Sequence, residues 1–259
     1  MLGGINIELN KIYFGNCLEV MKDIDNKSID LILCDLPYGQ TARNKWDIII
    51  PFDELWMHYE RIIKENGAIC LFANGMFTAD LMISNRKMWK YNLIWDKIMT
   101  TGFLNANRMP LRKHEDVLVF YKKQPTYNPQ KFKGEKKSHS KGDKARDDIS
   151  GSNYSKANMI DKSNEHGNMK FPTSIIIFGK IHPSLTIHPT QKPLELFEYL
   201  IKTYTNKNDI VLDNCIGSGT TAIACLNTNR QYIGIEKEEK YFNLANERIN
   251  QYKYQKYIK

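Results

Sequence analysis

Residues 209–236, DIVLDNCIGSGTTAIACLNTNRQYIGIE, decide the fold of this chain. In order, they read as a strand, a tight glycine turn, a helix and a second strand, over 209–213, 217–219, 220–227 and 232–236. This order predicts a β-turn-α-β unit of the kind that binds nucleotides. Glycine lets the backbone approach a ligand closely, and Glu236, 19 residues after Gly217, stands where a carboxylate can hold ribose hydroxyls. The spacing fits an adenosine-containing cofactor.

The glycine turn alone leaves two explanations open. It follows the G-x-G-x-x-G pattern of dinucleotide sites only in part, since the chain reads GSGTTA at 217–222. Tight strand-to-helix connections also use glycine for steric reasons. Other parts of the chain must therefore decide between a cofactor site and a structural turn.

Short apolar runs alternate with helix-like segments over most of the chain. The runs that read as strands are 28–34, 68–73, 91–96, 116–121 and 174–178. The segments that read as helices are 51–64, 76–88, 193–204 and the polar stretch after 236. Asn66 and Gly67 are expected to end the first of these helices. The pattern predicts an α/β fold with about seven mostly parallel strands and helices on both faces of the sheet.

The segment 122–172 interrupts this alternation. Residues 122–170 hold 12 Lys and Arg against 6 Asp and Glu, most of the excess in a chain whose net charge is +8. Such a composition is typical of a solvated loop, but aromatic residues interleaved with cations also suit a nucleic-acid surface. We expect a basic insertion that separates two halves of one domain, 1–121 and 173–259. Its candidate DNA contacts are Lys131, Lys133, Lys136, Lys137, Lys141, Lys144 and Arg146.

The composition excludes several classes of protein. With 259 residues, 42% hydrophobic and 25% charged, the chain resembles an ordinary globular protein with one large core. No apolar run reaches the roughly 18 residues that span a bilayer, and the first 16 residues lack the core of a signal peptide, so we expect a cytoplasmic protein without membrane contact. The five cysteines are scattered and form no CxxC pair, which argues against disulfides and a metal site.

A second motif, Asp35-Leu36-Pro37-Tyr38, follows the strand 28–34. Ligands of open α/β sheets bind at this carboxyl edge of the strands. An exocyclic base amine is a poor nucleophile because its lone pair is delocalised, and hydrogen bonds accepted from its two protons restore it. A carboxylate and a backbone carbonyl beside the proline can accept those bonds, while Tyr38 offers a face for an extruded base. Alone, the motif also fits a turn in which Asp35 caps a helix.

Together the two motifs resemble a known family, the S-adenosylmethionine-dependent DNA amino-methyltransferases of the permuted β group. In that group D-P-P-Y precedes the target-recognition region, which precedes the glycine motif. This chain has DLPY, the basic insertion and DNCIGSGTT in the same order. Further similar segments are NCL at 16–18, WDK at 95–97, GFLNA at 102–106 and HPTQKP at 188–193. The resemblance covers nearly the whole chain and implies a Rossmann-like methyltransferase fold with an inserted target-recognition region.

The resemblance also implies roles for individual residues. In the catalytic motif, Asp35 would polarise the target amine, Leu36 would accept through its carbonyl ahead of Pro37, and Tyr38 would stack on the flipped base. Asp213 would lie near the amino group of the cofactor, and Glu236 would bind its ribose. The implied cofactor-binding residues are Asn16, Cys17, Asp35, Lys192, Asp213, Asn214, Cys215, Gly217, Ser218, Gly219, Thr220 and Glu236.

The chain departs from the family pattern at three places. Leu36 replaces the usual proline, Asn16 stands where Asp is frequent, and NCI at 214–216 replaces a Pro-Phe-Ala-like run. The first change concerns a residue that acts through its backbone, so we expect little loss. Asn16 can still hydrogen-bond the cofactor adenine, more weakly than Asp. The run at 214–216 changes the packing of the methionine and adenine parts rather than the use of the cofactor.

The implied activity is site-specific methylation of adenine N6 in duplex DNA by base flipping, with S-adenosylmethionine as methyl donor and no metal. Asp rather than Ser at the start of the first motif favours adenine over cytosine. The alternatives are cytosine-N4 methylation, methylation of RNA or of a protein side-chain amide, and a catalytically silent DNA-binding relative. A homodimer and a cognate restriction endonuclease are further partners that the resemblance allows.

Overall fold

The computed structural model describes residues 6–40, 47–134, 168–180 and 191–258. The chain forms two compact units, one from Met1–Asn128 and Ser174–Lys259 and the other from Pro129–Thr173. The second unit overlaps the segment 122–172 that the sequence analysis expects to be an insertion. Within the described residues, no helix is both long enough and apolar enough to cross a membrane.

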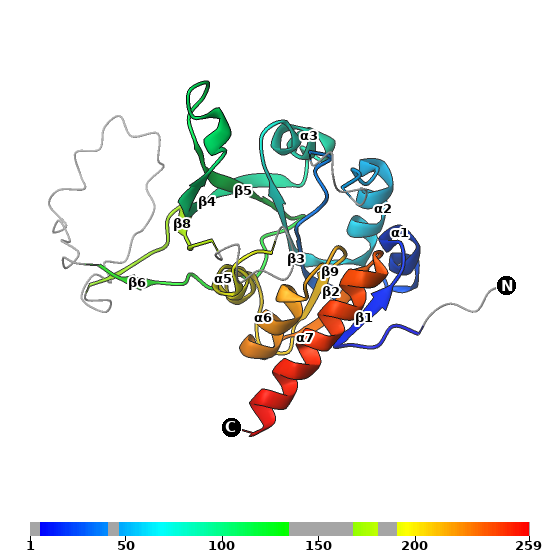
Figure 1. Ribbon diagram of the computed structural model, residues 1–259. Helices are drawn as coiled ribbons and strands as arrows, with labels where there is room; N and C mark the ends of the chain where they lie inside the picture. Colours follow the sequence, from blue (N-terminus) through cyan, green and yellow to red (C-terminus); the bar gives the residue numbers. More distant parts are fainter. Residues whose placement is uncertain (1–5, 41–46, 135–167, 181–190, 259) are drawn as a thin grey trace, which may run out of the picture. The chain divides into compact units, whose positions relative to one another are not determined.

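In the described part of the first unit, eight strands form one sheet, in the order β1, β10, β9, β2, β3, β5, β4, β8 (Figure 1). Five neighbouring pairs are parallel, and the two pairs that β5 makes, with β3 and β4, are antiparallel. The predicted α/β fold with a mostly parallel sheet is therefore confirmed. The strands are β1 (Lys11–Phe14), β2 (Ile29–Cys34), β3 (Ile63–Ala73), β4 (Trp89–Thr101), β5 (Arg112–Phe120), β8 (Ile175–Ile177), β9 (Ile210–Asp213) and β10 (Gln231–Glu236).

This sheet has one strand more than the seven expected. Among the strands that the sequence pattern does not indicate is β1, which lies at the edge of the sheet and pairs in parallel with β10. Its four residues, KIYF, show an exposed-buried-buried-exposed pattern that is too short to distinguish from a loop. Such a strand is defined by the neighbour it pairs with rather than by its own sequence.

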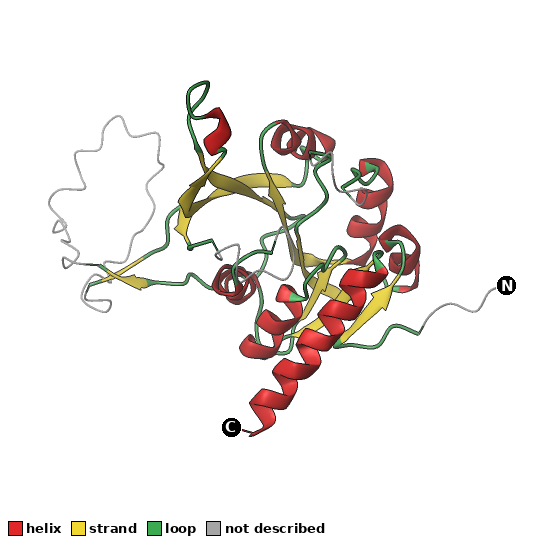
Figure 2. Ribbon diagram, in the orientation of Figure 1, coloured by secondary structure: helices red, strands yellow, loops and turns green. Residues whose placement is uncertain are grey.

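Helices cover both faces of the sheet (Figure 2). The core of one face includes α1 (Cys17–Val20), α2 (Phe52–Ile62) and α3 (Met76–Ser84), and that of the other includes α5 (Leu194–Tyr204), α6 (Thr220–Thr228) and α7 (Glu239–Ile258). Strand β2 sends Leu31 and Leu33 into one core and Ile32 and Cys34 into the other, all fully buried. Burial on both faces explains its continuous apolar sequence.

Two helix ends differ from the sequence-based prediction. Helix α2 ends at Ile62 and β3 begins at Ile63, so Asn66 and Gly67 lie within the strand and do not end the helix. The register of β2 against β3 shifts here, and a Cβ at Gly67 would lie 2.8 Å from the Ile63 side chain and 2.9 Å from the Asp30 carbonyl oxygen. This glycine therefore permits a close approach in an irregular strand. Helix α3 ends at Ser84, before the expected Met88.

The carboxyl ends of three neighbouring strands carry the two sequence motifs. Strand β2, which Asp35 follows, pairs directly with β9, which leads into the glycine turn. Strand β9 pairs in turn with β10, which ends at Glu236. The motifs are about 180 positions apart in sequence, yet they meet at one edge of the sheet, as the permuted motif order predicts.

Candidate active site

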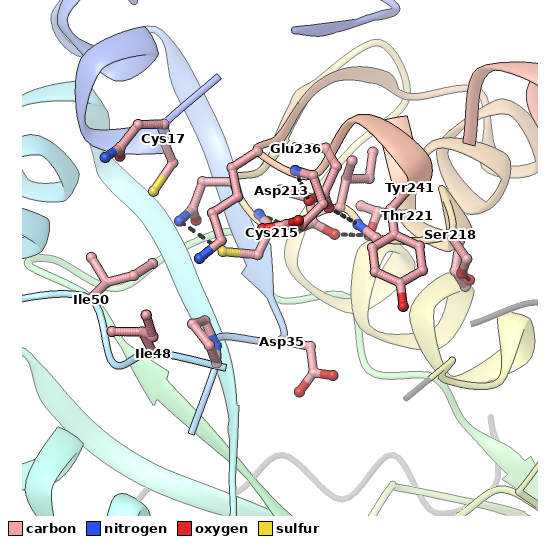
Figure 3. Close-up of a pocket in the computed structure, with 18 of the residues that line it drawn as sticks. Cys17, Asp35, Ile48, Ile50, Asp213, Cys215, Ser218, Thr221, Glu236 and Tyr241 are labelled. Atoms are coloured by element: carbon pink, nitrogen blue, oxygen red, sulfur yellow. Dashed lines mark hydrogen bonds between the residues drawn. The ribbon is translucent and has the colours of Figure 1, made fainter. Parts of the chain in front are cut away.

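A cavity of about 250 Å³ opens at this edge of the sheet (Figure 3). It is lined by eleven of the twelve residues that the sequence analysis proposes for the cofactor, namely Asn16, Cys17, Asp35, Lys192, Asp213, Asn214, Cys215, Gly217, Ser218, Thr220 and Glu236. The twelfth, Gly219, is not among the lining residues. It has a φ of +78°, and a Cβ there would lie 3.3 Å from the Cβ of Ala245 on α7, so this glycine shapes the turn and its packing.

Glu236 is held in place by backbone groups. Its Oε2 accepts a hydrogen bond of 2.9 Å from the Gly217 N–H, and its Oε1 accepts one of 2.9 Å from the Glu238 N–H. Burial raises the pKa of this carboxyl, although three backbone donors, the N–H groups of Glu238, Gly217 and Lys237, work in the opposite direction. A carboxylate has about four acceptor sites, so Glu236 can still accept from a hydroxyl in the cavity.

Asp213, at the end of β9, is almost fully buried, with 3% of its surface exposed. Its Oδ1 accepts from the Cys215 N–H at 3.1 Å, and its Oδ2 accepts from the hydroxyl of Thr221. Burial raises the pKa of Asp213 to about 7. A cation brought into the cavity would favour the ionised form of this carboxyl and so bind beside it.

Asp35 lies apart from these two carboxylates in Figure 3 and has side-chain partners instead. The Tyr38 hydroxyl donates to Oδ1 at 2.7 Å, and the Lys192 ammonium donates to Oδ2 at 2.6 Å. Lys192 lies 157 residues further along the chain, just ahead of α5. Burial raises the pKa of Asp35, although Lys192 pulls it down.

A second, partly buried carboxylate lies on the other side of Lys192. Glu115, on β5, places Oε2 3.4 Å from the Lys192 nitrogen, and its Oε1 pairs with the Lys97 ammonium at 3.1 Å. The Lys192 nitrogen also lies 5.2 Å from the centre of the Phe72 ring and 6.0 Å from that of Tyr38. Sequence reasoning missed Glu115 because it lies in a different strand, outside both motifs.

The remaining residues of the DLPY motif occupy different environments. Pro37 lines the cavity, while Leu36 is 4% exposed and packs into the core beneath it. The Tyr38 ring stacks on Phe77, with ring centres 4.9 Å apart and planes 30° from parallel. Phe77 therefore supports the ring that the sequence analysis assigns to a flipped base.

Other lining residues were not expected from the sequence. The longest run is 48–51, IIIP, whose apolar side chains form one wall of the cavity. An apolar run that lies between DLPY and the next helix, and begins ten residues after Tyr38, is a signal that could have indicated this wall. The others are Gly15, Leu18, Gln191, Phe197, Ile216, Thr221, Lys237, Glu238 and Tyr241.

The five cysteines are all free, and three of them, Cys17, Cys34 and Cys215, interact with one another beside the cavity. Burial raises the pKa of Cys34 to about 12, so its thiol is protonated at neutral pH. The described residues contain no group of three His, Cys, Asp or Glu side chains arranged to hold a metal ion.

Two of the candidate DNA contacts belong to the second unit's described residues. Lys133 ends β6 (Phe132–Lys133), which pairs antiparallel with β7 (Met169–Lys170). The Lys131 ammonium lies 4.5 Å from the centre of the Phe171 ring, which is 60% exposed. Lys136, Lys137, Lys141, Lys144 and Arg146 lie outside the described residues, as does the HPT part (188–190) of the HPTQKP segment.

Comparison with known proteins identifies the class to which this fold and site belong. A family model described as DNA methylase, for N6 and N4 methyltransferases, matches residues 29–247. The chain is a member of this family, as the resemblance of its motifs predicts.

Individual relatives agree with the family assignment. The type II methyltransferase M.BglII of Bacillus subtilis is 30% identical over 266 residues, which cover 92% of this chain and 68% of the relative. M1.MboII of Moraxella bovis is 28% identical, with 95% of this chain and 98% of the relative covered.

Solved structures show the same fold. The complex of M1.HpyAVI with S-adenosylmethionine is 25% identical and has a TM-score of 0.62, covering 93% of this chain and 98% of that one. The cytosine-N4-specific PvuII DNA methyltransferase, at 15% identity, has a TM-score of 0.63 and covers 91% and 84%. The Rossmann-like methyltransferase fold is therefore shared across relatives of low sequence identity.

Proposed function

We propose that the chain transfers a methyl group from S-adenosylmethionine to the exocyclic N6 amine of adenine in duplex DNA. The observation that carries this proposal is the shared cavity, because it brings Asp35 and the glycine turn to neighbouring strand ends. Asp at the first position of the motif favours adenine. Methylation of the cytosine N4 amine uses the same chemistry and is the second candidate, since a cytosine-N4-specific enzyme has the same fold.

The residues of the cavity fit S-adenosylmethionine. Glu236 can still accept from a ribose hydroxyl, and the Asp213 carboxyl suits the cationic amino group of the methionine part. The apolar wall at 48–51 and the side chain of Leu18 suit the adenine ring. When bound, the cofactor would supply a methyl group on a sulfonium; its transfer to the amine would leave a neutral thioether, and the methylated amine would lose one proton to solvent.

Asp35 would act on the target amine. Its carboxylate accepts a hydrogen bond from the amine, which directs the nitrogen lone pair toward the methyl group and stabilises the positive charge that develops there. The Leu36 carbonyl would accept the second proton of the amine, and Tyr38, supported by Phe77, would stack on the extruded base. Positioning and electrostatics then supply most of the rate.

The second unit would contact DNA. Lys131 and Lys133, with the exposed Phe132 and Phe171, combine cations and aromatic rings on a short two-stranded element. Such a combination suits phosphate contacts and base stacking. The candidates at 136, 137, 141, 144 and 146 would extend this surface with further positive charge.

The proposal is tested by expressing the protein in a host without DNA methylation and sequencing a plasmid with a method that detects modified bases. N6-methyladenine at one recurrent short sequence is the expected result. N4-methylcytosine in place of N6-methyladenine would favour the second candidate, methylation of the cytosine N4 amine. An unmodified plasmid, with a folded protein present, would contradict both and favour a silent DNA-binding relative or another substrate.

A further inference from the structure

The partners of Asp35 pose a problem for the proposed chemistry. One oxygen accepts from the Tyr38 hydroxyl and the other from the Lys192 ammonium, at 2.7 and 2.6 Å. An ammonium in contact with the carboxylate neutralises the charge that should attract the target amine. It would also repel the positive charge that develops on that amine during methyl transfer. Binding of the amine and methyl transfer to it are therefore favoured if Lys192 leaves Asp35 before the reaction.

The structure provides a second acceptor for Lys192 close by. Oε2 of Glu115 is shielded from solvent and already forms an ion pair of 3.4 Å with the lysine nitrogen, which is longer than the 2.6 Å contact of that nitrogen with Asp35. The other oxygen of Glu115 is held by Lys97, whose side chain is 4% exposed. A good hydrogen bond between an ammonium and a carboxylate is about 2.7 to 2.9 Å long, so a shift of the Lys192 nitrogen towards Glu115 would strengthen this contact as the contact with Asp35 is lost.

The exchange would keep every buried charge paired. Asp35 and Glu115 are two partly buried anions, and Lys97 and Lys192 are two buried cations beside them. The Phe72 ring, 5.2 Å from the Lys192 nitrogen, offers an electron-rich face to the ammonium. A base amine that replaces the ammonium at Asp35 therefore leaves Lys192 with another anion, whereas removal of either anion would leave a cation poorly paired.

We propose that Glu115 is a positioning residue that receives Lys192 from Asp35 when the target base enters, which frees Asp35 to accept the amine. This inference rests on the proposed function. Asp35 would be paired with Lys192 in the absence of DNA and would be free of it when a base is in place. Glu115 acts through Lys192 and does not touch the base.

The protonation states agree with this arrangement. Burial raises the pKa of Glu115, but Lys192 and Lys97 outweigh it, so that this pKa is lowered and the carboxylate is ionised. Burial lowers the pKa of Lys192, but Asp35 and Glu115 outweigh it, so that its pKa is raised and the ammonium stays charged. Lys192 can therefore move between two anions without losing its proton.

The first test is the variant Glu115→Gln, which keeps the size of the side chain and removes the charge that would receive Lys192. We expect the single-turnover rate of methyl transfer to DNA to fall by about 10-fold to 100-fold, the scale expected when a reacting group is misplaced. The affinities for S-adenosylmethionine and DNA should stay within about threefold of the wild type. An unchanged rate in a folded variant would overturn the inference.

A pH profile separates this role from a merely structural one. Among the residues that the structure describes, the charged and titratable groups around Asp35 are Lys192, Glu115, Tyr38, Asp213 and Cys34. Glu115 raises the pKa of Asp35, so its removal should lower that pKa, and the acid limb of the rate profile should move to lower pH while the plateau falls. A lower plateau with an unmoved acid limb would indicate a structural defect and overturn the inference.

The chain offers a matched control in Asp30→Asn. Asp30 is a carboxylate of similar exposure, 15% against 16% for Glu115, and it pairs with Lys64 at 2.8 Å near the amino end of β2. Its loss should reduce stability but leave the rate and the pH profile unchanged. An equal loss of rate in both variants would show that loss of a carboxylate ion pair elsewhere in the sheet has the same effect, and would overturn the inference.

A second measurement needs no variant. A crystal structure of the wild-type protein with S-adenosylhomocysteine and a duplex that it methylates should place the Lys192 nitrogen nearer to Glu115 than to Asp35. A lysine that stays on Asp35 with the base in place would overturn the exchange, whatever the behaviour of Glu115→Gln. A different result would contradict the proposed function, namely that the wild-type protein does not methylate DNA.

Discussion

The two halves of the cavity hold their carboxylates in different ways. On the cofactor side, Glu236 accepts from backbone N–H groups, and Asp213 accepts from one backbone N–H and a threonine hydroxyl. On the amine side, the hydrogen-bond donors to Asp35 within the described part of the chain are side chains, those of Tyr38 and Lys192. Backbone donors are fixed by the strand and turn, whereas side chains can change partners. The cofactor half is therefore preformed, and the amine half can rearrange.

The largest effect is expected on the amine side. Asp35→Ala removes the acceptor on which charge develops, so the single-turnover rate should fall by about 10² to 10³-fold or more. The affinity for S-adenosylmethionine should change by only a few-fold, because the cofactor half keeps its backbone-held carboxylates. Rapid-quench methyl transfer and calorimetry measure the two quantities. A folded variant that loses cofactor binding and rate together would break the comparison between the halves.

The next effect concerns Asp213, whose pKa burial raises to about 7. A bound cationic cofactor favours the ionised carboxylate and lowers this pKa. Below pH 7, where the free protein holds Asp213 protonated, binding therefore requires Asp213 to release its proton. Between pH 7 and pH 5 the affinity for S-adenosylmethionine should fall by about tenfold per pH unit. Calorimetric titration across this range measures it, with Asp213→Asn as control. A flat profile in the wild type would remove Asp213 from the cofactor site.

A smaller effect is expected for Glu236→Gln. The Gln amide oxygen can still accept a backbone N–H, but its NH₂ group faces another donor and cannot accept from a ribose hydroxyl. We expect cofactor affinity to fall by about tenfold, with the single-turnover rate at saturating cofactor nearly unchanged. Glu236→Gln should therefore reduce cofactor affinity more than the single-turnover rate, whereas Asp35→Ala should reduce the rate more than the affinity. This opposite pattern sharpens the comparison between the two halves.

The smallest effect leaves both halves of the cavity untouched. Lys131→Ala with Lys133→Ala should reduce the slope of log affinity for DNA against log salt by about two, one for each lost phosphate contact. Cofactor affinity and the rate at saturating DNA should not change. Fluorescence anisotropy at several salt concentrations measures the slope. Lys22→Ala with Lys27→Ala removes the same charge from the first unit, and an equal change there would mean that the slope reports net charge alone.

The sequence predicts those parts of the site that are local in the chain. The strands β2, β9 and β10 are continuous apolar runs buried on two faces, and the glycine turn and Glu236 lie at fixed distances from them. Eleven of twelve proposed cofactor residues therefore reach one cavity. Gly219 is the exception, because its contact with Ala245 on α7 depends on how a distant helix packs.

The parts that the sequence does not predict depend on contacts between distant segments. The contact of Lys192 with Asp35 joins residues 157 positions apart, and Glu115 reaches them from an antiparallel strand. Strand β1 exists as a strand only through its pairing with β10. Neither a charge pair of this kind nor a four-residue edge strand leaves a periodic pattern in the sequence, so only the folded chain reveals them.

The central claim is that the sheet-edge cavity transfers a methyl group to a base amine of DNA. Its most direct test uses the wild-type protein, S-adenosylmethionine labelled in the methyl group, and duplex DNA that is digested to nucleosides after one turnover. The account predicts that the label elutes with N6-methyldeoxyadenosine. Label that stays with the protein or with the cofactor, and none in any DNA nucleoside, would contradict the account.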